Sequence, residues 1–150
     1  MELLLNSDDN TIQDRLVDLI ENSRSIKILS PYVTKNKALD CILEKANFKL
    51  TLVIDFDPES LMRGSSCLDV NQIKKLIDSG QDVYYNPELH SKLFITDDSV
   101  ILSSSNFTRN GLSKRKESSI LFRRSLNQKI YDECVNYFND VLRSSTKISV

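Results

Sequence analysis

The sequence is poor in the residues that build several common enzyme sites. Its 150 residues include one histidine, three cysteines and three glycines. One histidine and three widely spaced cysteines, with no Cys-x-x-Cys pair, do not make a usual zinc ligand set. Three glycines leave little room for a P-loop or a Gly-x-Ser-x-Gly elbow, and neither motif is present. These absences disfavour zinc enzymes, P-loop nucleotide hydrolases and serine hydrolases built on that elbow.

Long hydrophobic runs are also missing. No apolar run approaches the ~20 residues that a membrane-spanning helix needs. The opening ELLLN is too short for the core of a signal peptide, and no small-residue cleavage site follows it. We therefore expect a cytoplasmic protein without membrane association, in which Cys41, Cys67 and Cys134 are buried free thiols.

The charge is nearly balanced overall but uneven along the chain. Hydrophobic residues make up 40% and charged residues 27% of the sequence, which is typical of a globular protein, and the length predicts one domain over residues 1–150. A net charge of −1 argues against a basic protein that coats DNA. Between residues 109 and 124, however, Glu117 is the only acidic residue. Such a run is either a solvated loop or a phosphate-binding rim, here formed by Arg109, Lys114, Arg115, Lys116, Arg123 and Arg124.

Hydrophobic periodicity predicts helices that alternate with strands. Helical spacing covers residues 12–20, after the cap candidates Asp9 and Asn10, then residues 36–46 and the segment from Asp69 to Gly80. Strand patterns cover residues 25–30, 49–55, 82–85, 91–96, 100–104 and 117–122, with TDDS as a turn between the fourth and fifth. A long helix closes the chain, and we expect these of its residues to face inward: Ile130, Cys134, Tyr137, Phe138, Val141 and Leu142. This order predicts an α/β fold with a mixed, partly parallel β-sheet flanked by helices on both faces.

The single histidine lies in the stretch LHSKLFITDDSVILSSSNF, residues 89–107. Residues two apart on a strand share a face, so His90 and Lys92 point the same way, about 7 Å apart along the strand. If the next segment forms a hairpin with this strand, Ser104 and Asn106 come level with them. A cation, a hydroxyl and an amide around an imidazole suit a tetrahedral phosphodiester better than a carbonyl.

These residues, in this order, resemble the motif of the phospholipase D superfamily, His-x-Lys-x4-Asp followed by Gly-Ser-x-Asn. Here the motif reads His90, Lys92 and Asp97, then Ser103 to Asn106, so Ser103 stands where the family has glycine and the gap is one residue shorter. Residues 68–95 and 105–122 resemble the flanks of the motif in the bacterial single-motif nuclease branch. In the second flank, Glu117 occupies the place of the family's downstream glutamate.

The resemblance implies a role for each motif residue. His90 would attack phosphorus and form a phosphohistidine, while Lys92 and Asn106 would hold the non-bridging oxygens with help from Ser104. Glu117 would hydrogen-bond a histidine ring and select its tautomer. No metal or other cofactor is implied, because lysine and amide groups supply the charge stabilisation.

Two further expectations concern the hairpin and the oligomeric state. By strand parity Asp97 faces away from the site, so we expect it only to position the hairpin. One histidine cannot serve both as nucleophile and as the acid opposite it, and single-motif members of the family solve this by homodimerising. We therefore expect a homodimer whose two motifs meet at a twofold axis.

Three classes of function remain open. A nuclease acting on DNA or RNA is favoured by the basic residues, of which Arg109, Lys114, Arg115 and Lys116 are the predicted nucleic-acid contacts. The alternatives are a lipid phosphodiesterase, and a non-catalytic module for nucleic-acid binding or dimerisation in which Ser103 marks a decayed site. A magnesium pair formed by Asp55 and Asp57 is disfavoured because no further ligands follow in register.

Overall fold

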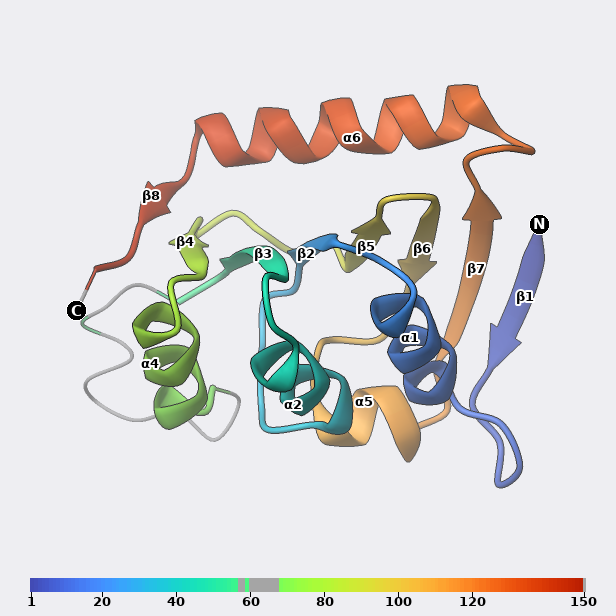
Figure 1. The fold of residues 1–150 in the computed structure, drawn as a ribbon, viewed down its shortest axis with the longest axis horizontal. Helices are drawn as coiled ribbons and strands as arrows, with labels where there is room; N and C mark the ends of the chain where they lie inside the picture. The colour runs from blue at the N-terminus through green and yellow to red at the C-terminus, as the bar shows by residue number, and fades with distance from the viewer. Residues whose placement is uncertain (57–58, 60–67, 150) are drawn as a thin grey trace.

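The protein forms a mixed, partly parallel sheet between two layers of helices, as the sequence predicts, and the sheet has eight strands. A computed structural model describes residues 1–56, 59 and 68–149. The strand order is β1-β7-β6-β5-β2-β3-β4-β8; β2, β3 and β4 run parallel to one another and the other neighbouring pairs are antiparallel. Figure 1 shows α6 along one face of the sheet and α1, α2, α4 and α5 against the other.

The elements follow the predicted pattern with additions at both ends of the chain. The helices are α1 (Ile12–Glu21), α2 (Lys37–Glu44), α4 (Val70–Asp78), α5 (Arg109–Ser113) and α6 (Gln128–Arg143). The strands are β1 (Glu2–Leu5), β2 (Ser25–Leu29), β3 (Lys49–Ile54), β4 (Asp82–Tyr85), β5 (Leu93–Thr96), β6 (Ser99–Ser103), β7 (Ser118–Arg123) and β8 (Thr146–Lys147). Of these, β1, α5 and β8 were not predicted.

Local side chains explain where the helices begin and end. The α1 cap is Thr11, whose hydroxyl accepts a hydrogen bond from the Asp14 N–H, so the two predicted cap candidates before it were wrong. Asp69 caps α4 as predicted. Gly80 follows this helix with φ of +91°, a left-handed conformation that glycine adopts without the steric cost of a Cβ atom.

The sheet separates two hydrophobic layers. The larger layer packs α1, α2, α4 and α5 against one face and includes Phe94 and Phe107, whose rings meet edge to face at 6.1 Å. The smaller layer lies under α6 and includes Leu93 and Ile95. Alternation along β5 therefore sends neighbouring side chains to different layers, as its period of two requires.

The inward face of α6 differs from the prediction in one turn. Tyr137 is 48% exposed, with its hydroxyl 2.9 Å from that of Ser91, so the prediction that it faces inward was wrong. Tyr131 is buried instead and donates a 2.6 Å hydrogen bond to the carbonyl of Thr96. Helical spacing alone admits either tyrosine, and the position of the helix across the sheet decides between them.

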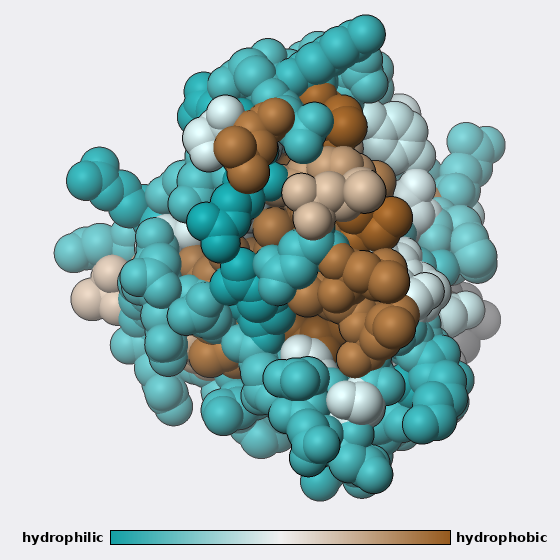
Figure 2. Space-filling view, turned by 90° about the vertical axis from the view of Figure 1, so that its right-hand side faces the viewer, coloured by the Kyte–Doolittle hydropathy of each residue, from teal (hydrophilic) through white to brown (hydrophobic). Residues whose placement is uncertain are grey.

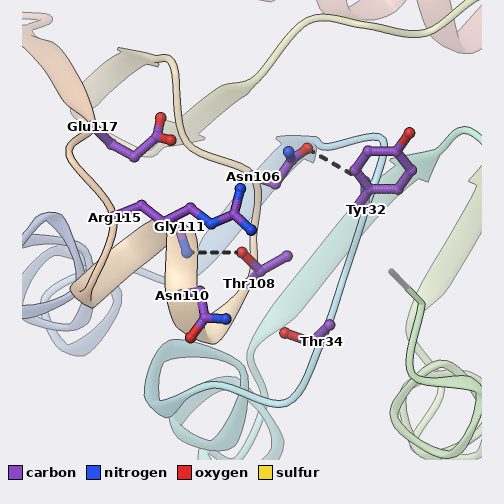
Figure 3. Close-up of a pocket in the computed structure, with 8 residues that line it drawn as sticks. All are labelled: Tyr32, Thr34, Asn106, Thr108, Asn110, Gly111, Arg115 and Glu117. Atoms are coloured by element: carbon purple, nitrogen blue, oxygen red, sulfur yellow. Dashed lines mark hydrogen bonds between the residues drawn. The ribbon is translucent and has the colours of Figure 1, made fainter. Parts of the chain in front are cut away.

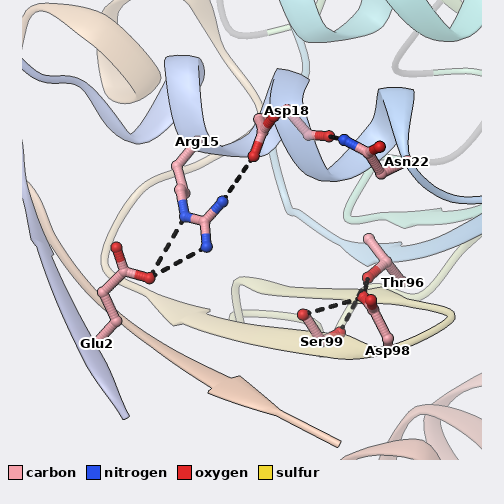
Figure 4. A network of polar contacts seen from close by, with 7 residues as sticks. All are labelled: Glu2, Arg15, Asp18, Asn22, Thr96, Asp98 and Ser99. Carbon is pink, nitrogen blue, oxygen red and sulfur yellow. Dashed lines mark hydrogen bonds and ion pairs between the residues drawn. The ribbon is translucent and has the colours of Figure 1, made fainter.

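Polar contacts fasten the first strand to the body of the domain (Figure 4). The Arg15 guanidinium on α1 bridges Glu2 of β1 at 3.2 Å and Asp18 of its own helix at 2.7 Å. In the predicted turn between β5 and β6, the Asp98 carboxylate accepts hydrogen bonds from the hydroxyls of Thr96 and Ser99. The turn holds the hairpin that carries the histidine motif.

Two of the residues discussed in the sequence analysis lie outside the described part of the chain. Cys67 and Asp57 lie there, so their predicted roles stay untested. Cys41 and Cys134 are free thiols, half-buried rather than buried. Burial raises the pKa of both thiols above its ordinary value, and a raised thiol pKa makes a reactive thiolate less available.

Candidate active site

His90 and Lys92 lie in the extended segment that leads into β5. The strand begins at Leu93, two residues later than predicted, but the side chains keep the predicted alternation. Ser91 turns toward α6, where it meets Tyr137. The imidazole of His90 is exposed and Lys92 is half-buried. The segment thus presents an accessible ring nitrogen beside a partly desolvated cation.

The Lys92 ammonium is held against its own segment. Nζ donates a 2.8 Å hydrogen bond to the His90 carbonyl and lies 3.5 Å from Nδ1 of the His90 ring. Burial lowers the pKa of Lys92 below its ordinary value of 10.5, while the nearby Glu117 carboxylate raises it by a smaller amount. Partial burial disfavours the charged form of Lys92, so an anionic ligand at this position would stabilise it.

Ser104 and Glu117 are brought into direct contact at the same end of the sheet. The hairpin continues past β6 through the Ser103 N–H, which donates to the Lys92 carbonyl at 3.2 Å. The Ser104 hydroxyl then donates to Glu117 Oε2, and its N–H bonds the Ser118 carbonyl at 3.0 Å. Within the described residues, Glu117 makes no hydrogen bond to His90 of the same chain.

Asn106 lies farther from the histidine, at the end of β2. Its Oδ1 accepts hydrogen bonds from the Tyr32 N–H and the Ser30 hydroxyl, both at 3.4 Å. These bonds orient the amide, and Nδ2 is left without a partner among the residues that the structure describes. An amide donor therefore opens onto the end of the sheet, as binding of a phosphate oxygen requires.

The serine that stands in the place of glycine takes part in the turn after β6. Ser103 Oγ accepts hydrogen bonds from the Ser105 N–H at 2.8 Å and from the Ser119 hydroxyl at 2.7 Å. The turn therefore accommodates this hydroxyl and uses it. Serine in place of glycine at position 103 is therefore compatible with the local structure, because its hydroxyl is hydrogen-bonded there.

Asp97 fastens β2 to the hairpin. Its carboxylate accepts from the N–H of Arg24 at 2.7 Å and from the N–H and hydroxyl of Ser25 at 3.2 and 2.8 Å. Burial raises the pKa of Asp97, but these hydrogen bonds outweigh it and leave the pKa below its ordinary value. The residue contacts the start of β2, at the opposite end of β5 from His90, so its role here is architectural.

Comparison with known proteins identifies the family of this chain. Residues 16–142 match the family model described as the phospholipase D-like domain of cardiolipin synthase. The chain belongs to the phospholipase D-like family. No curated protein sequence matches it significantly.

Several solved structures share the fold of this phospholipase D-like chain over almost its whole length. Nuc from Salmonella typhimurium, a phospholipase D family member, is 16% identical with a TM-score of 0.80, and 99% of each chain is covered. NucT from Helicobacter pylori is 19% identical with a TM-score of 0.76, and 98% of each chain is covered. TrmBL2, an archaeal chromatin protein, is 10% identical with a TM-score of 0.65 over 99% of this chain and 54% of that one.

The basic residues that follow the phospholipase D-like motif fall into two separate groups. Arg109, Lys114, Arg115 and Lys116 lie on α5 or just after it, all exposed, and none forms an ion pair with another described residue. Arg123 ends β7 at the far end of that strand from Glu117, and Arg124, which follows it, lies over the Tyr131 ring at 5.1 Å. The prediction that all six basic residues form one rim was therefore wrong for Arg123 and Arg124.

Of the magnesium pair that the sequence disfavours as an alternative to the phospholipase D-like site, only Asp55 lies in the described part of the chain. Burial raises the pKa of Asp55, and the nearby His90 lowers it by a smaller amount. Asp55 thus lies within electrostatic range of the imidazole, while Asp57 lies outside the described residues. Within residues 1–56, 59 and 68–149, no group of three or more His, Cys, Asp or Glu side chains is arranged to hold a metal ion.

A cavity that the sequence did not predict opens beside Asn106 (Figure 3). Tyr32 and Thr34 line it from the segment after β2, Thr108 from the start of α5, and Arg115 and Glu117 from the segment after that helix. His90 and Lys92 lie outside it. The available signal was that Tyr32 closely follows a parallel strand, since ligands bind at the carboxyl ends of such strands.

Buried Asn6 is a second residue that the sequence did not single out. Its Nδ2 donates to the carbonyls of Gly111 and Arg115 at 2.9 and 3.0 Å, and its N–H donates to the Glu117 carbonyl at 3.2 Å. Its Oδ1 accepts from the N–H of Ile12. Asn6 thereby joins α1 to the segment that positions Glu117.

Proposed function

We propose that this protein is a metal-independent phosphodiesterase that cleaves nucleic acid through a phosphohistidine intermediate. One observation carries the proposal. At a single end of the sheet, an exposed imidazole stands beside a partly buried lysine, with the Ser104 hydroxyl and the unpartnered Asn106 amide donor of the described structure at the same edge. Membership of the phospholipase D-like family supports assigning these side chains to phosphodiester chemistry.

The reaction proceeds in two displacements. A ring nitrogen of His90 attacks phosphorus, the bond to one ester oxygen breaks, and that oxygen leaves with a proton from a general acid. Water then attacks the phosphohistidine and restores the free imidazole. Lys92 and the Asn106 amide hold the charge that develops on the non-bridging oxygens, which is the task of a divalent cation in metal-dependent enzymes.

The general acid must stand on the side of phosphorus opposite to His90. The chain has no second histidine, and one imidazole cannot occupy both sides of an in-line displacement. We infer that a second copy of the chain supplies the acid, with its His90 related to the first by a twofold axis.

An exposed apolar face supports this pairing. Leu3, Ile120 and Leu102 lie in register across β1, β7 and β6, on the face of the sheet that carries α6. The helix packs over β2 to β6 and over the Phe122 end of β7, but it does not cover the rest of this face, so Leu3 is 64% and Leu102 42% exposed. Figure 2 shows the apolar patch on the side of the molecule that carries β1 and β7.

The position of the apolar face makes a second copy the fitting occupant. Leu102 precedes Ser104 by two residues, and Leu5, 54% exposed, pairs with Ser118, the residue that follows Glu117. A contiguous apolar patch of this kind marks an interaction surface. A copy docked here would bring its own motif toward the incomplete site.

Charge supports a nucleic-acid substrate. The four exposed basic residues on and after α5 lie next to the site and lack described ion-pair partners, so they are available to phosphates on either side of the scissile one. TrmBL2, which shares the fold, is described as having a novel mode of DNA binding. The part of the chain that the structure describes has no helix long and apolar enough to cross a membrane.

Cleavage in the presence of a chelator tests the proposal. We expect the purified protein to cleave single-stranded DNA, RNA and bis(p-nitrophenyl) phosphate in excess EDTA, and His90→Ala to be inactive under the same conditions. Loss of activity in EDTA that magnesium restores would overturn the mechanism. Hydrolysis of phosphatidylglycerol vesicles without cleavage of any nucleic acid would favour the lipid alternative, and nucleic-acid binding with no cleavage of any diester would favour the non-catalytic one.

A further inference from the structure

The cavity beside Asn106 combines an aromatic wall with a cation. It measures about 250 Å³, below the ~300–1,000 Å³ of pockets that enclose a whole small ligand. Figure 3 shows the Tyr32 ring next to Asn106, with its hydroxyl pointing away from that amide, and the Arg115 guanidinium reaching toward Asn106 and Thr108. A cavity of this size next to a phosphate ligand fits one part of a larger substrate.

The aromatic wall is held in position from behind. The rings of Tyr32 and Phe56 are 5.5 Å apart and tilted by 37°, and both side chains are half-buried. The Tyr32 N–H donates to Asn106 Oδ1 at 3.4 Å, so the backbone that carries the ring is held next to the Asn106 amide. A ring fixed in this way loses little conformational entropy when a planar group stacks on it.

The polar wall is also fixed. Thr108 Oγ1 accepts a hydrogen bond from the Gly111 N–H at 3.0 Å as the cap of α5. A Cβ at Gly111 would lie 2.7 Å from Ser105 Oγ and 2.8 Å from Thr108 Oγ1, so only glycine lets the helix pack this closely against the turn. The Arg115 side chain makes no hydrogen bond or ion pair with another described residue and is free to bind an anion.

We propose that this cavity is a nucleobase subsite, in which the base adjacent to the scissile phosphate stacks on Tyr32 and a flanking phosphate pairs with Arg115. The inference rests on the proposed phosphodiesterase function and narrows its substrate to single-stranded nucleic acid. A base can stack on Tyr32 only after leaving a duplex, and a lipid headgroup has no aromatic face to offer. Base–aromatic stacking of this kind is tolerant of sequence, because every base has a π-face.

An oligonucleotide with one missing base tests the subsite. The substrate is an end-labelled single strand that carries one tetrahydrofuran abasic nucleotide in its middle, and cleavage at each bond is read from the product ladder. Wild type should cleave one bond, at a fixed offset from the abasic nucleotide, about 5- to 100-fold less than the same bond of the intact strand. Cleavage at each bond is expressed as a fraction of the total cleavage of the same strand before the two strands are compared. A uniform change in activity therefore does not alter the result.

Variants assign the depleted bond to the Tyr32 ring. Tyr32→Leu should give no depletion, whereas Tyr32→Phe, which keeps the ring, should retain it. Tyr84→Leu is the matched control, because Tyr84 is a half-buried tyrosine that packs under α6 and does not line the cavity; it should also retain the depletion. Depletion that persists in Tyr32→Leu, or is absent in wild type, overturns the subsite.

Binding separates failure of the subsite from failure of the proposed function. Fluorescence anisotropy should show that wild type prefers the intact strand to a fully abasic one, and that Tyr32→Leu has lost the preference. Arg115→Gln should weaken binding and reduce the slope of log K against log salt by about one. If no substrate is cleaved but these differences hold, the phosphodiesterase proposal fails and the subsite stands. Equal affinity of wild type for both strands overturns the subsite whatever the activity.

Discussion

At the scale of single residues, Lys92 shows how local structure supports the proposed phosphate site. Lys92 directly precedes the buried residues Leu93 and Phe94, and its half-buried ammonium lies against the carbonyl of His90. Burial lowers its pKa more than Glu117 raises it. Lys92 is therefore a cation that gains from an anionic partner, and it loses its charge at lower pH than an ordinary lysine.

We expect an alkaline limb of the activity profile, separate from any limb that the general acid contributes, to report the charge of Lys92. The protonated form is active, so kcat/KM should fall as pH rises through a midpoint below the ordinary lysine value of 10.5. Lys92→Arg should lack this limb, because the guanidinium stays protonated at these pH values. Lys92→Met should lower kcat by about 10²–10³-fold.

The stability of the same variants shows whether the lysine is structural. A half-exposed lysine contributes little to the free energy of unfolding, so Lys92→Met should melt close to wild type. Lys129→Met, an exposed lysine on α6, is the matched control for removing one surface cation. If Lys92→Met melted far below this control, the lysine would be structural and the site misassigned.

At the scale of elements, the β5–β6 hairpin depends on one carboxylate. The distance along the chain from Asp97 to Arg24 and Ser25 is more than 70 residues, yet three hydrogen bonds join them. These bonds fix the alignment of β2 beside β5. The segment after β2 carries Tyr32 and the groups that donate hydrogen bonds to Asn106 Oδ1, so this alignment also positions them. The motif aspartate thus acts on the site through strand alignment.

We expect Asp97→Ala to lower the free energy of unfolding by about 1–3 kcal/mol, because it leaves part-buried N–H groups without their acceptor. Asp97→Asn should lose less, since it keeps one acceptor oxygen. The folded pKa of Asp97 is lowered, so its contribution is present above the unfolded pKa of ~3.9 and is lost as pH falls through the folded value. Urea unfolding at pH 7 and pH 3 should therefore show the difference between wild type and Asp97→Asn shrinking at the lower pH. A difference that is the same at both pH values would contradict this role.

At the scale of the whole molecule, the proposed reaction needs more groups than one chain brings together. The chain has one imidazole, and Glu117 contacts Ser104 rather than His90. The open apolar face along Leu3, Ile120 and Leu102 ends beside these residues. The exposed apolar face and the chemistry of the proposed reaction both support the proposed second copy at the same edge.

Mixed dimers test the shared site. After full subunit exchange between equal amounts of wild type and His90→Ala, about a quarter of the dimers hold two histidines by random pairing. Activity should fall to about a quarter of that of wild type at the same total protein. Retention of about half, with exchange confirmed, would mean that each chain works alone.

The sequence by itself determined the positions of the helices and strands with strong periodicity. It also determined the motif, because its residues are close together in the chain. The alternation in β2, β3 and β5 and the spacing in α1 and α4 placed these elements to within one or two residues. The motif residues His90 and Lys92 are neighbours by strand geometry alone. The mixed sheet followed from the order of helices and strands, because parallel strands require crossover connections.

Only the tertiary structure decided which distant residues meet. The first strand, ELLL, has no alternation to announce it, and its partner β7 lies more than 100 residues away. The cavity joins Tyr32 to Arg115, and the basic run separates because β7 carries Arg123 and Arg124 to the far end of the sheet. Periodicity reports which face of an element is buried, but the element that covers that face depends on pairing across the whole chain.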